Sequence, residues 1–123
     1  MKPLKIYVAG PYTPSNSNLR DAARTAHQNT MEAIRAGIKL IEKGHIPFIP
    51  HLTHFMHLEM QKPLPASFYY EYDMVWQRDC NALLYLGYSK GAKLELDWAI
   101  RNGLRIFRSV HEVIIGKKHR KRH

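Results

Sequence analysis

Residues 89–95, with the sequence SKGAKLE, place a Ser/Gly turn and a carboxylate between a predicted strand and a predicted helix. Residues 82–86 are apolar throughout, which is typical of a strand that is covered on both faces. The helix that follows should carry Glu95 in its first turn and end at Asn102. In open α/β sheets, ligands bind at the carboxyl ends of the strands. We therefore predict that the Ser89 hydroxyl and the amides near Gly91 bind a phosphate or a sugar hydroxyl beside that carboxylate.

Two residues outside this turn should join Glu95 in one cleft. Tyr7 falls near the end of the first predicted strand, and Asp73 falls on the helix before the third strand. A tyrosine hydroxyl can orient a carboxylate, and a glutamate near a helix N-terminus should be ionised at neutral pH, as a nucleophile requires. The pattern leaves other roles open. Tyr7 could be a core residue, Glu95 could serve only the helix dipole, and Asp73 could be a solvated charge or a partner of Arg78.

The elements that must position these residues alternate between strand and helix. The expected strands are residues 4–9, 46–50, 82–86 and 104–107. The expected helices are residues 19–43, 51–60 and 67–80, with Ser67 as a cap, and the helix after Ser89; a short element follows at 110–115. Six apolar residues recur at helical spacing and predict the long helix, namely Ala22, Ala26, Ala33, Ile34, Ile38 and Ile41. This alternation predicts an α/β, flavodoxin-like or Rossmann-like layered fold, with a central parallel sheet of four or five strands flanked by helices.

Charge is distributed unevenly along the 123 residues. The formal net charge is +9, and residues 101–123 hold eight lysines and arginines against one glutamate, which accounts for seven of the nine charges. We expect one domain over residues 1–115 and a basic, solvated tail over 116–123. Such a tail can bind nucleic acid, but no aromatic residues interleave it, so we favour the solvated tail. Alternatively, its cations reach a phosphate in a neighbouring subunit's pocket.

The remaining sequence features exclude several classes of protein. The apolar runs are too short to span a membrane, and the N-terminus has no signal-peptide core. Cys80 is the only cysteine, which excludes an internal disulfide and fits the reducing cytoplasm. The turn Gly10-Pro11-Tyr12 lacks the G-x-G-x-x-G fingerprint, and no Walker lysine motif is present. We therefore expect neither NAD nor phosphoryl transfer from ATP, and no cofactor.

Four motifs in fixed order carry a resemblance to a known family. They are KIYVAGPY at residues 5–12, GHIPFIPH at 44–51, Asp73-x-x-Trp76, and Ser89-x-Gly91-x-x-x-Glu95. On these motifs the chain, over nearly its whole length, resembles the nucleoside 2-deoxyribosyltransferase-like family, which includes the 2'-deoxynucleoside 5'-phosphate N-hydrolases. The spacing from Asp73 to Ser89 is shorter than in the closest hydrolases, which could reposition Asp73 relative to the base.

The resemblance implies a role for each matching residue. Glu95 would be the nucleophile at the anomeric carbon, Tyr7 would orient it, and Asp73 would assist protonation of the leaving base. Ser89 would contact the 5' end of the sugar. Family transferases typically have an acidic residue at this position, which would repel a phosphate, so a serine favours a 5'-phosphate. Further substrate contacts are expected from the residues that flank the first strand and the turn, which are Gly10, Pro11, Tyr12, Ser15, Ser17, His51 and Gly91.

The expected reaction is hydrolysis of the N-glycosidic bond of a (deoxy)nucleoside 5'-monophosphate. It would pass through a covalent glycosyl-Glu95 intermediate, as in a retaining glycosidase. The alternatives are base exchange by a nucleoside 2-deoxyribosyltransferase and a nucleotide-binding module without turnover. The resemblance also implies a homodimer or larger homo-oligomer with a small-molecule nucleotide or nucleoside as ligand.

A histidine cluster departs from the family pattern. His51, His54 and His57 recur at a spacing of three residues, with His45 nearby. Histidines at this spacing on a helix can bind a metal, but no carboxylate or cysteine set completes a site. We therefore expect no metal and favour histidines that line the base pocket or cap the second strand.

Overall fold

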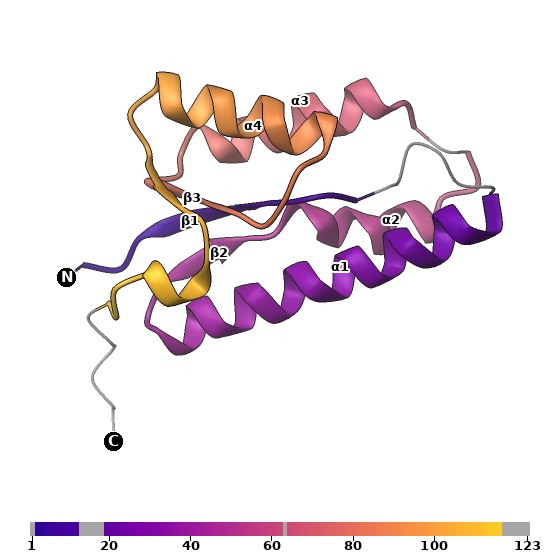
Figure 1. The fold of residues 1–123 in the computed structure, drawn as a ribbon. Helices are drawn as coiled ribbons and strands as arrows, with labels where there is room; N and C mark the ends of the chain where they lie inside the picture. Colours follow the sequence, from indigo (N-terminus) through magenta and orange to yellow (C-terminus); the bar gives the residue numbers. More distant parts are fainter. Residues whose placement is uncertain (1, 13–18, 63, 117–123) are drawn as a thin grey trace.

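Four parallel strands form the centre of the protein in a computed structural model that describes residues 2–12, 19–62 and 64–116. The strands are β1 (Lys5–Ala9), β2 (Ile46–Phe48), β3 (Ala82–Tyr85) and β4 (Arg105–Phe107), in the spatial order β2-β1-β3-β4. The α-helices are α1 (Leu19–Glu42), α2 (Thr53–Glu59), α3 (Ala66–Gln77) and α4 (Lys90–Arg101), and the short 3-10 helices are η1 (Pro50–Leu52) and η2 (Val110–Glu112). The predicted α/β layered fold with a parallel sheet is confirmed (Figure 1).

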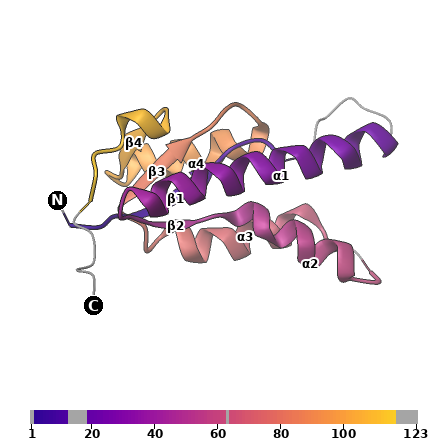
Figure 2. The same cartoon turned by 90° about the horizontal axis from the view of Figure 1, so that it is seen from below.

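Helices cover the sheet on both faces because the central strands β1 and β3 bury residues 6–9 and 82–84, which alternate between the two faces. Ile6 and Val8 of β1 pack with α1 and Val113 on one face. Tyr7 and Ala9, which alternate with them, pack with α4 on the other face. Figures 1 and 2 show the same layers, with α1 on one side of the sheet and α3 and α4 on the other.

The buried face of α1 agrees only in part with the predicted one. Ala26 and Ala33 are buried, but Ile38 and Ile41 are 47% and 58% exposed. Ala36 and Leu40 are buried in their place. The reason is close packing at Gly37, where an added Cβ would lie 2.3 Å from the Cδ1 atom of Ile49. A helix that approaches its neighbours this closely buries small residues and turns larger ones to solvent.

Two helix starts bear on the site. Ser67 is not a cap, because α3 begins at Ala66 with Pro65 at the N-cap position and no side-chain cap hydrogen bond. By contrast, α4 begins directly after Ser89, whose Oγ atom accepts a hydrogen bond of 3.0 Å from the Ala92 amide.

Some predicted site and tail residues lie in parts of the chain that the structure does not describe. Ser15, Ser17 and residues 117–123 of the basic tail lie outside the described residues. Within the described ranges, no helix is both long enough and apolar enough to cross a membrane.

Candidate active site

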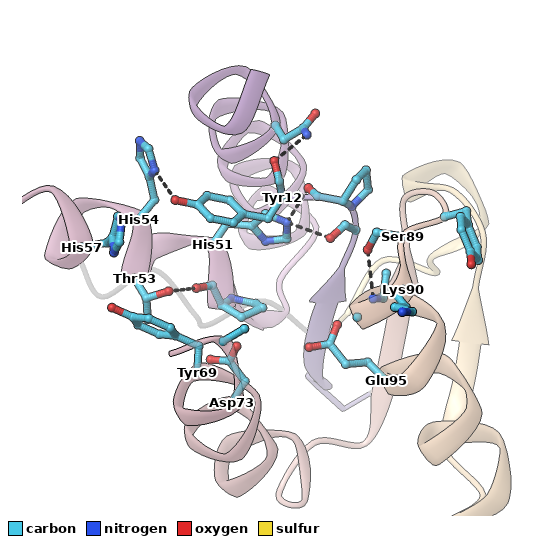
Figure 3. A pocket seen from close by; sticks show the side chains of 18 of the residues that line it. Tyr12, His51, Thr53, His54, His57, Tyr69, Asp73, Ser89, Lys90 and Glu95 are labelled. Carbon is cyan, nitrogen blue, oxygen red and sulfur yellow. Dashed lines mark hydrogen bonds between the residues drawn. The ribbon is translucent and has the colours of Figure 1, made fainter. Parts of the chain in front are cut away.

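A pocket of about 1000 Å³ opens beyond the carboxyl ends of β1 and β3. Its walls are the loop after β1, the segment from η1 to α2, one face of α3 and the start of α4 (Figure 3). This is the edge of a parallel sheet at which ligands bind. Because each wall comes from a different part of the sequence, only the fold brings them together.

The structure brings Tyr7 and Glu95 together, although only Glu95 lines the pocket. The Tyr7 hydroxyl donates a hydrogen bond of 2.5 Å to Oε2 of Glu95. Tyr7 is fully buried in the middle of β1, and Glu95 lines the pocket. Burial and the negative charges of Glu95 and Asp73 raise the pKa of Tyr7 well above its usual range. The tyrosine therefore stays protonated and holds one carboxyl oxygen of Glu95 in place.

Glu95 differs from the prediction in its position on the helix and in its protonation. It is the sixth residue of α4, and the first turn of that helix holds no acidic residue. The helix dipole falls off within one turn, so it does little to keep Glu95 ionised. Burial raises the pKa of Glu95 to about 8; the Tyr7 hydrogen bond lowers it in part, and the charge of Asp73 raises it further. The unliganded carboxyl group is therefore mostly protonated at neutral pH, which corrects the expected carboxylate.

Asp73 is a buried pocket residue and not a solvated charge. It is 9% exposed, lines the pocket, and its Oδ1 atom has no hydrogen-bond partner. Burial raises the pKa of Asp73 to about 7, and no pairing with Arg78 contributes to that value. A carboxylic acid with this pKa can hold a proton at neutral pH and give it to a leaving group.

The Ser89 turn forms another side of the pocket. Ser89, Lys90, Gly91 and Ala92 all line it, and Figure 3 shows Ser89 and Lys90 at the start of α4. A Cβ added at Gly91 would meet nothing within 4 Å, so space is open next to the backbone there. The Ser89 oxygen accepts the Ala92 amide, which leaves its hydrogen free to donate to a ligand. Lys90 supplies a cation that the sequence analysis missed, although it stands between two of the motif residues.

The histidines have separate structural tasks. The Nε2 atom of His51 lies 3.1 Å from the carbonyl oxygens of Gly10 and of Pro11, so it donates to the loop after β1. His54 is hydrogen-bonded through Nδ1 to the Tyr12 hydroxyl at 2.6 Å. Gly10, Pro11, Tyr12 and His51 line the pocket, and their contact with a substrate stays a prediction.

His45 lies away from the pocket. Its Nδ1 atom accepts a hydrogen bond of 3.0 Å from the Leu4 amide, and its Nε2 atom donates to the Ile114 carbonyl. It thus ties the start of β1 to the segment after η2. Among the residues that the structure describes, no three His, Cys, Asp or Glu side chains gather closely enough to hold a metal ion.

Two further residues on α3 complete the site and carried no sequence signal. Tyr69 lies one turn before Asp73 and lines the pocket. Gln77 lies one turn after Asp73, is fully buried, and donates from Nε2 to the backbone carbonyl of Glu95 at 2.8 Å. A glutamine in a predicted helix is typical of the protein surface, so only the packing of α3 on α4 reveals the hydrogen bond of Gln77 to Glu95.

Comparison with known proteins places the chain in a family. A family described as "Domain of unknown function (DUF7768)" matches residues 4–109, and the chain belongs to it. No curated protein matches the chain. The matched region contains every described residue that was predicted for the site.

Proposed function

We propose that this member of the DUF7768 family hydrolyses the N-glycosidic bond of a nucleoside 5'-monophosphate, with Glu95 as the nucleophile. The single observation that carries the proposal is the hydrogen bond from buried Tyr7 to Glu95 inside a pocket that also holds Asp73. The motif resemblance to the nucleoside 2-deoxyribosyltransferase-like family supports the same assignment. A retaining glycosidase uses one carboxyl group as nucleophile and a second as proton donor, and Glu95, once ionised, and Asp73 would take these two roles.

The mechanism assigns one task to each residue. Glu95, once ionised, attacks C1' of the sugar, and the C1'–N bond breaks as Asp73 gives its proton to the leaving base. Tyr7 keeps the other carboxyl oxygen of Glu95 hydrogen-bonded through the step. Water then attacks C1' of the glycosyl ester and releases Glu95. The ionised Asp73 takes the proton of that water, which returns the site to its starting state.

The Ser89 turn would bind the 5'-phosphate. The free hydrogen of the Ser89 hydroxyl, the first amides of the 12-residue helix α4 and the Lys90 ammonium group all favour an anion. Gly91 leaves the backbone open to close approach. A phosphorylated sugar is therefore favoured over a free 5'-hydroxyl.

The experiment is a panel of nucleosides and nucleoside 5'-monophosphates scored for release of free base. Wild type should release base from at least one monophosphate, and Glu95→Ala should not. Asp97→Asn is the matched control, because Asp97 lies on the same helix and its carboxylate pairs with Lys93 at the surface. Adding a second free base separates the reactions: exchanged nucleotide indicates a transferase, and sugar phosphate indicates a hydrolase. Tight nucleotide binding without any base release would instead indicate a binding module.

A homodimer is part of the proposal. One face of α3 carries four apolar or aromatic residues, Phe68, Tyr72, Val75 and Trp76. Of these, Phe68 is 41% exposed, Val75 59% and Trp76 49%. Exposed apolar side chains that gather on one helix face are typical of an interaction site, and we propose that a second copy of the chain covers them. Val75→Lys should give monomers in sedimentation experiments. Ile41→Lys, an equally exposed apolar position on α1, should not.

The proposed location is the cytoplasm. A nucleotide substrate and a single cysteine both fit a reducing compartment.

A further inference from the structure

The helix α3 has few anchors for an element that carries a proposed catalytic acid. Its buried residues are Asp73, Met74 and Gln77, and most of its remaining side chains are exposed. Aromatic contacts hold its two ends: Trp76 stacks on Phe48 with ring centroids 5.4 Å apart, and the Tyr69 ring lies edge-on to His57 at 6.3 Å. The Tyr69 hydroxyl also donates to Sδ of Met60 at 3.5 Å. Within one protomer, the position of Asp73 therefore depends on a small number of contacts.

Gln77 makes the polar contact between the two helices that carry the carboxyl groups. It is fully buried, and its Nε2 atom donates to the backbone carbonyl of Glu95 at 2.8 Å. Gln77 follows Asp73 by four residues on α3, so the two side chains lie on the same face of the helix. The residue that accepts this bond is Glu95 itself. A single amide thus connects the turn that holds Asp73 to the turn that holds Glu95.

The Oε1 atom of the same side chain indicates that packing alone does not account for a glutamine at position 77. The Oε1 atom of Gln77 is buried and has no hydrogen-bond partner. An unpaired buried polar atom destabilises a fold, and an apolar side chain of the same shape would avoid that cost. Gln77 is therefore less favourable for the stability of the fold than a methionine or leucine that fills the same space. What it has and they lack is the Nε2 donor.

We propose that Gln77 is a positioning residue, whose amide fixes the separation of the Asp73 and Glu95 carboxyl groups by holding α3 on the backbone of Glu95. Its catalytic consequence rests on the proposed function, but the placement of the two carboxyl groups does not. When the amide is lost, α3 moves outward, water reaches both carboxyl groups, and Asp73 no longer lies where a leaving base needs its proton. Misplacement of a catalytic group by about 1 Å lowers rates on the order of a hundredfold.

The test compares Gln77→Met with Met74→Leu. The first variant keeps the approximate shape of the side chain but has no donor. The second alters a neighbouring residue of α3 that is 6% exposed and leaves the Gln77 amide intact. Two quantities are measured for each variant and for wild type: kcat and KM for base release from a nucleoside 5'-monophosphate, and the titration of Asp73 and Glu95 followed by carboxyl carbon NMR.

Gln77→Met should lower kcat by tenfold or more with KM within about threefold of wild type. Both carboxyl titrations should move to lower pH, because the two groups become more hydrated. Met74→Leu should change neither. Wild-type kcat and unchanged titrations in Gln77→Met would overturn the proposal, and so would the same changes in both variants.

A measurement on the wild-type protein covers the case in which Gln77→Met does not fold. A side-chain amide proton of Gln77 should be protected from exchange with solvent, unlike that of an exposed glutamine such as Gln61. If the Gln77 side-chain amide protons exchanged with solvent as fast as those of Gln61, the hydrogen bond from Gln77 to Glu95 would be refuted. If no form of the protein releases base, the proposed function fails, while the titrations still decide whether Gln77 positions the two carboxyl groups.

Discussion

Replacing Glu95 by glutamine should make the protein more stable at high pH while it removes activity. Glutamine has the same shape and can still accept the Tyr7 hydrogen bond, but it cannot ionise. Burial raises the pKa of Glu95 from 4.5 to about 8. Each pKa unit corresponds to about 1.4 kcal/mol, so ionising Glu95 in the folded protein costs about 5 kcal/mol more than in the unfolded chain.

The sign follows from comparing the folded and unfolded states. Below pH 4.5 the carboxyl group is protonated in both states and the folded protein loses nothing. As the pH rises, the unfolded chain ionises first, and wild type loses stability until the pH passes the folded value of about 8. Glu95→Gln does not experience this loss. Relative to wild type it should gain about 2–5 kcal/mol between pH 5 and pH 9, where the lower figure allows for water that reaches the ionised group.

The assay is urea unfolding of both proteins at several pH values, together with base release. The difference in free energy of unfolding should grow with pH and level off above pH 8. Asp97→Asn, a surface change on the same helix, should give a difference that does not vary in this way. Base release by Glu95→Gln should fall on the order of a thousandfold or more, because an amide cannot form the glycosyl ester. Parallel stability curves would refute the argument that burial controls Glu95, and full activity would refute its role as nucleophile.

Substitutions at three further residues test other parts of the site. Base release should peak between the pKa values of about 7 for Asp73 and about 8 for Glu95. The hydrogen bond from Tyr7 lowers the pKa of Glu95, so Tyr7→Phe should raise that pKa, lower the maximal rate and move the falling limb of the pH–rate profile to higher pH. Ser89→Asp keeps a helix cap but adds a negative charge, so KM should rise at least tenfold for a nucleotide and far less for the nucleoside. Ser89→Ala removes the cap and should lower the free energy of unfolding in urea by about 1 kcal/mol. His51→Leu removes the donor to the Gly10 and Pro11 carbonyls, which should lower the unfolding free energy by about 2 kcal/mol; an unchanged value would show that these contacts do not support the loop.

Local patterns in the sequence were sufficient for the frame of the fold. Apolar strands that alternate with helices predicted the parallel sheet, and the alternating faces of β1 confirm that it is covered on both sides. The start of α4 was also predictable, because Ser89 caps it through a contact three residues away. The buried face of α1 was predictable only in part. Ala26 and Ala33 are buried, but Ile38 and Ile41 face solvent because the close approach of Gly37 to Ile49 decides which side packs inward.

The sequence by itself determined the order of the elements, the Ser89 turn and the identities of Tyr7, Asp73 and Glu95, because these depend on residue type and on neighbours in the chain. Only the tertiary structure decided what state those residues adopt. The protonation of Glu95 follows from how much water the folded protein excludes, and this corrects the expectation based on its helix alone. The contact of Gln77 with Glu95 joins two residues that are 18 positions apart in the sequence and lie on different helices, and no local pattern predicts such a contact.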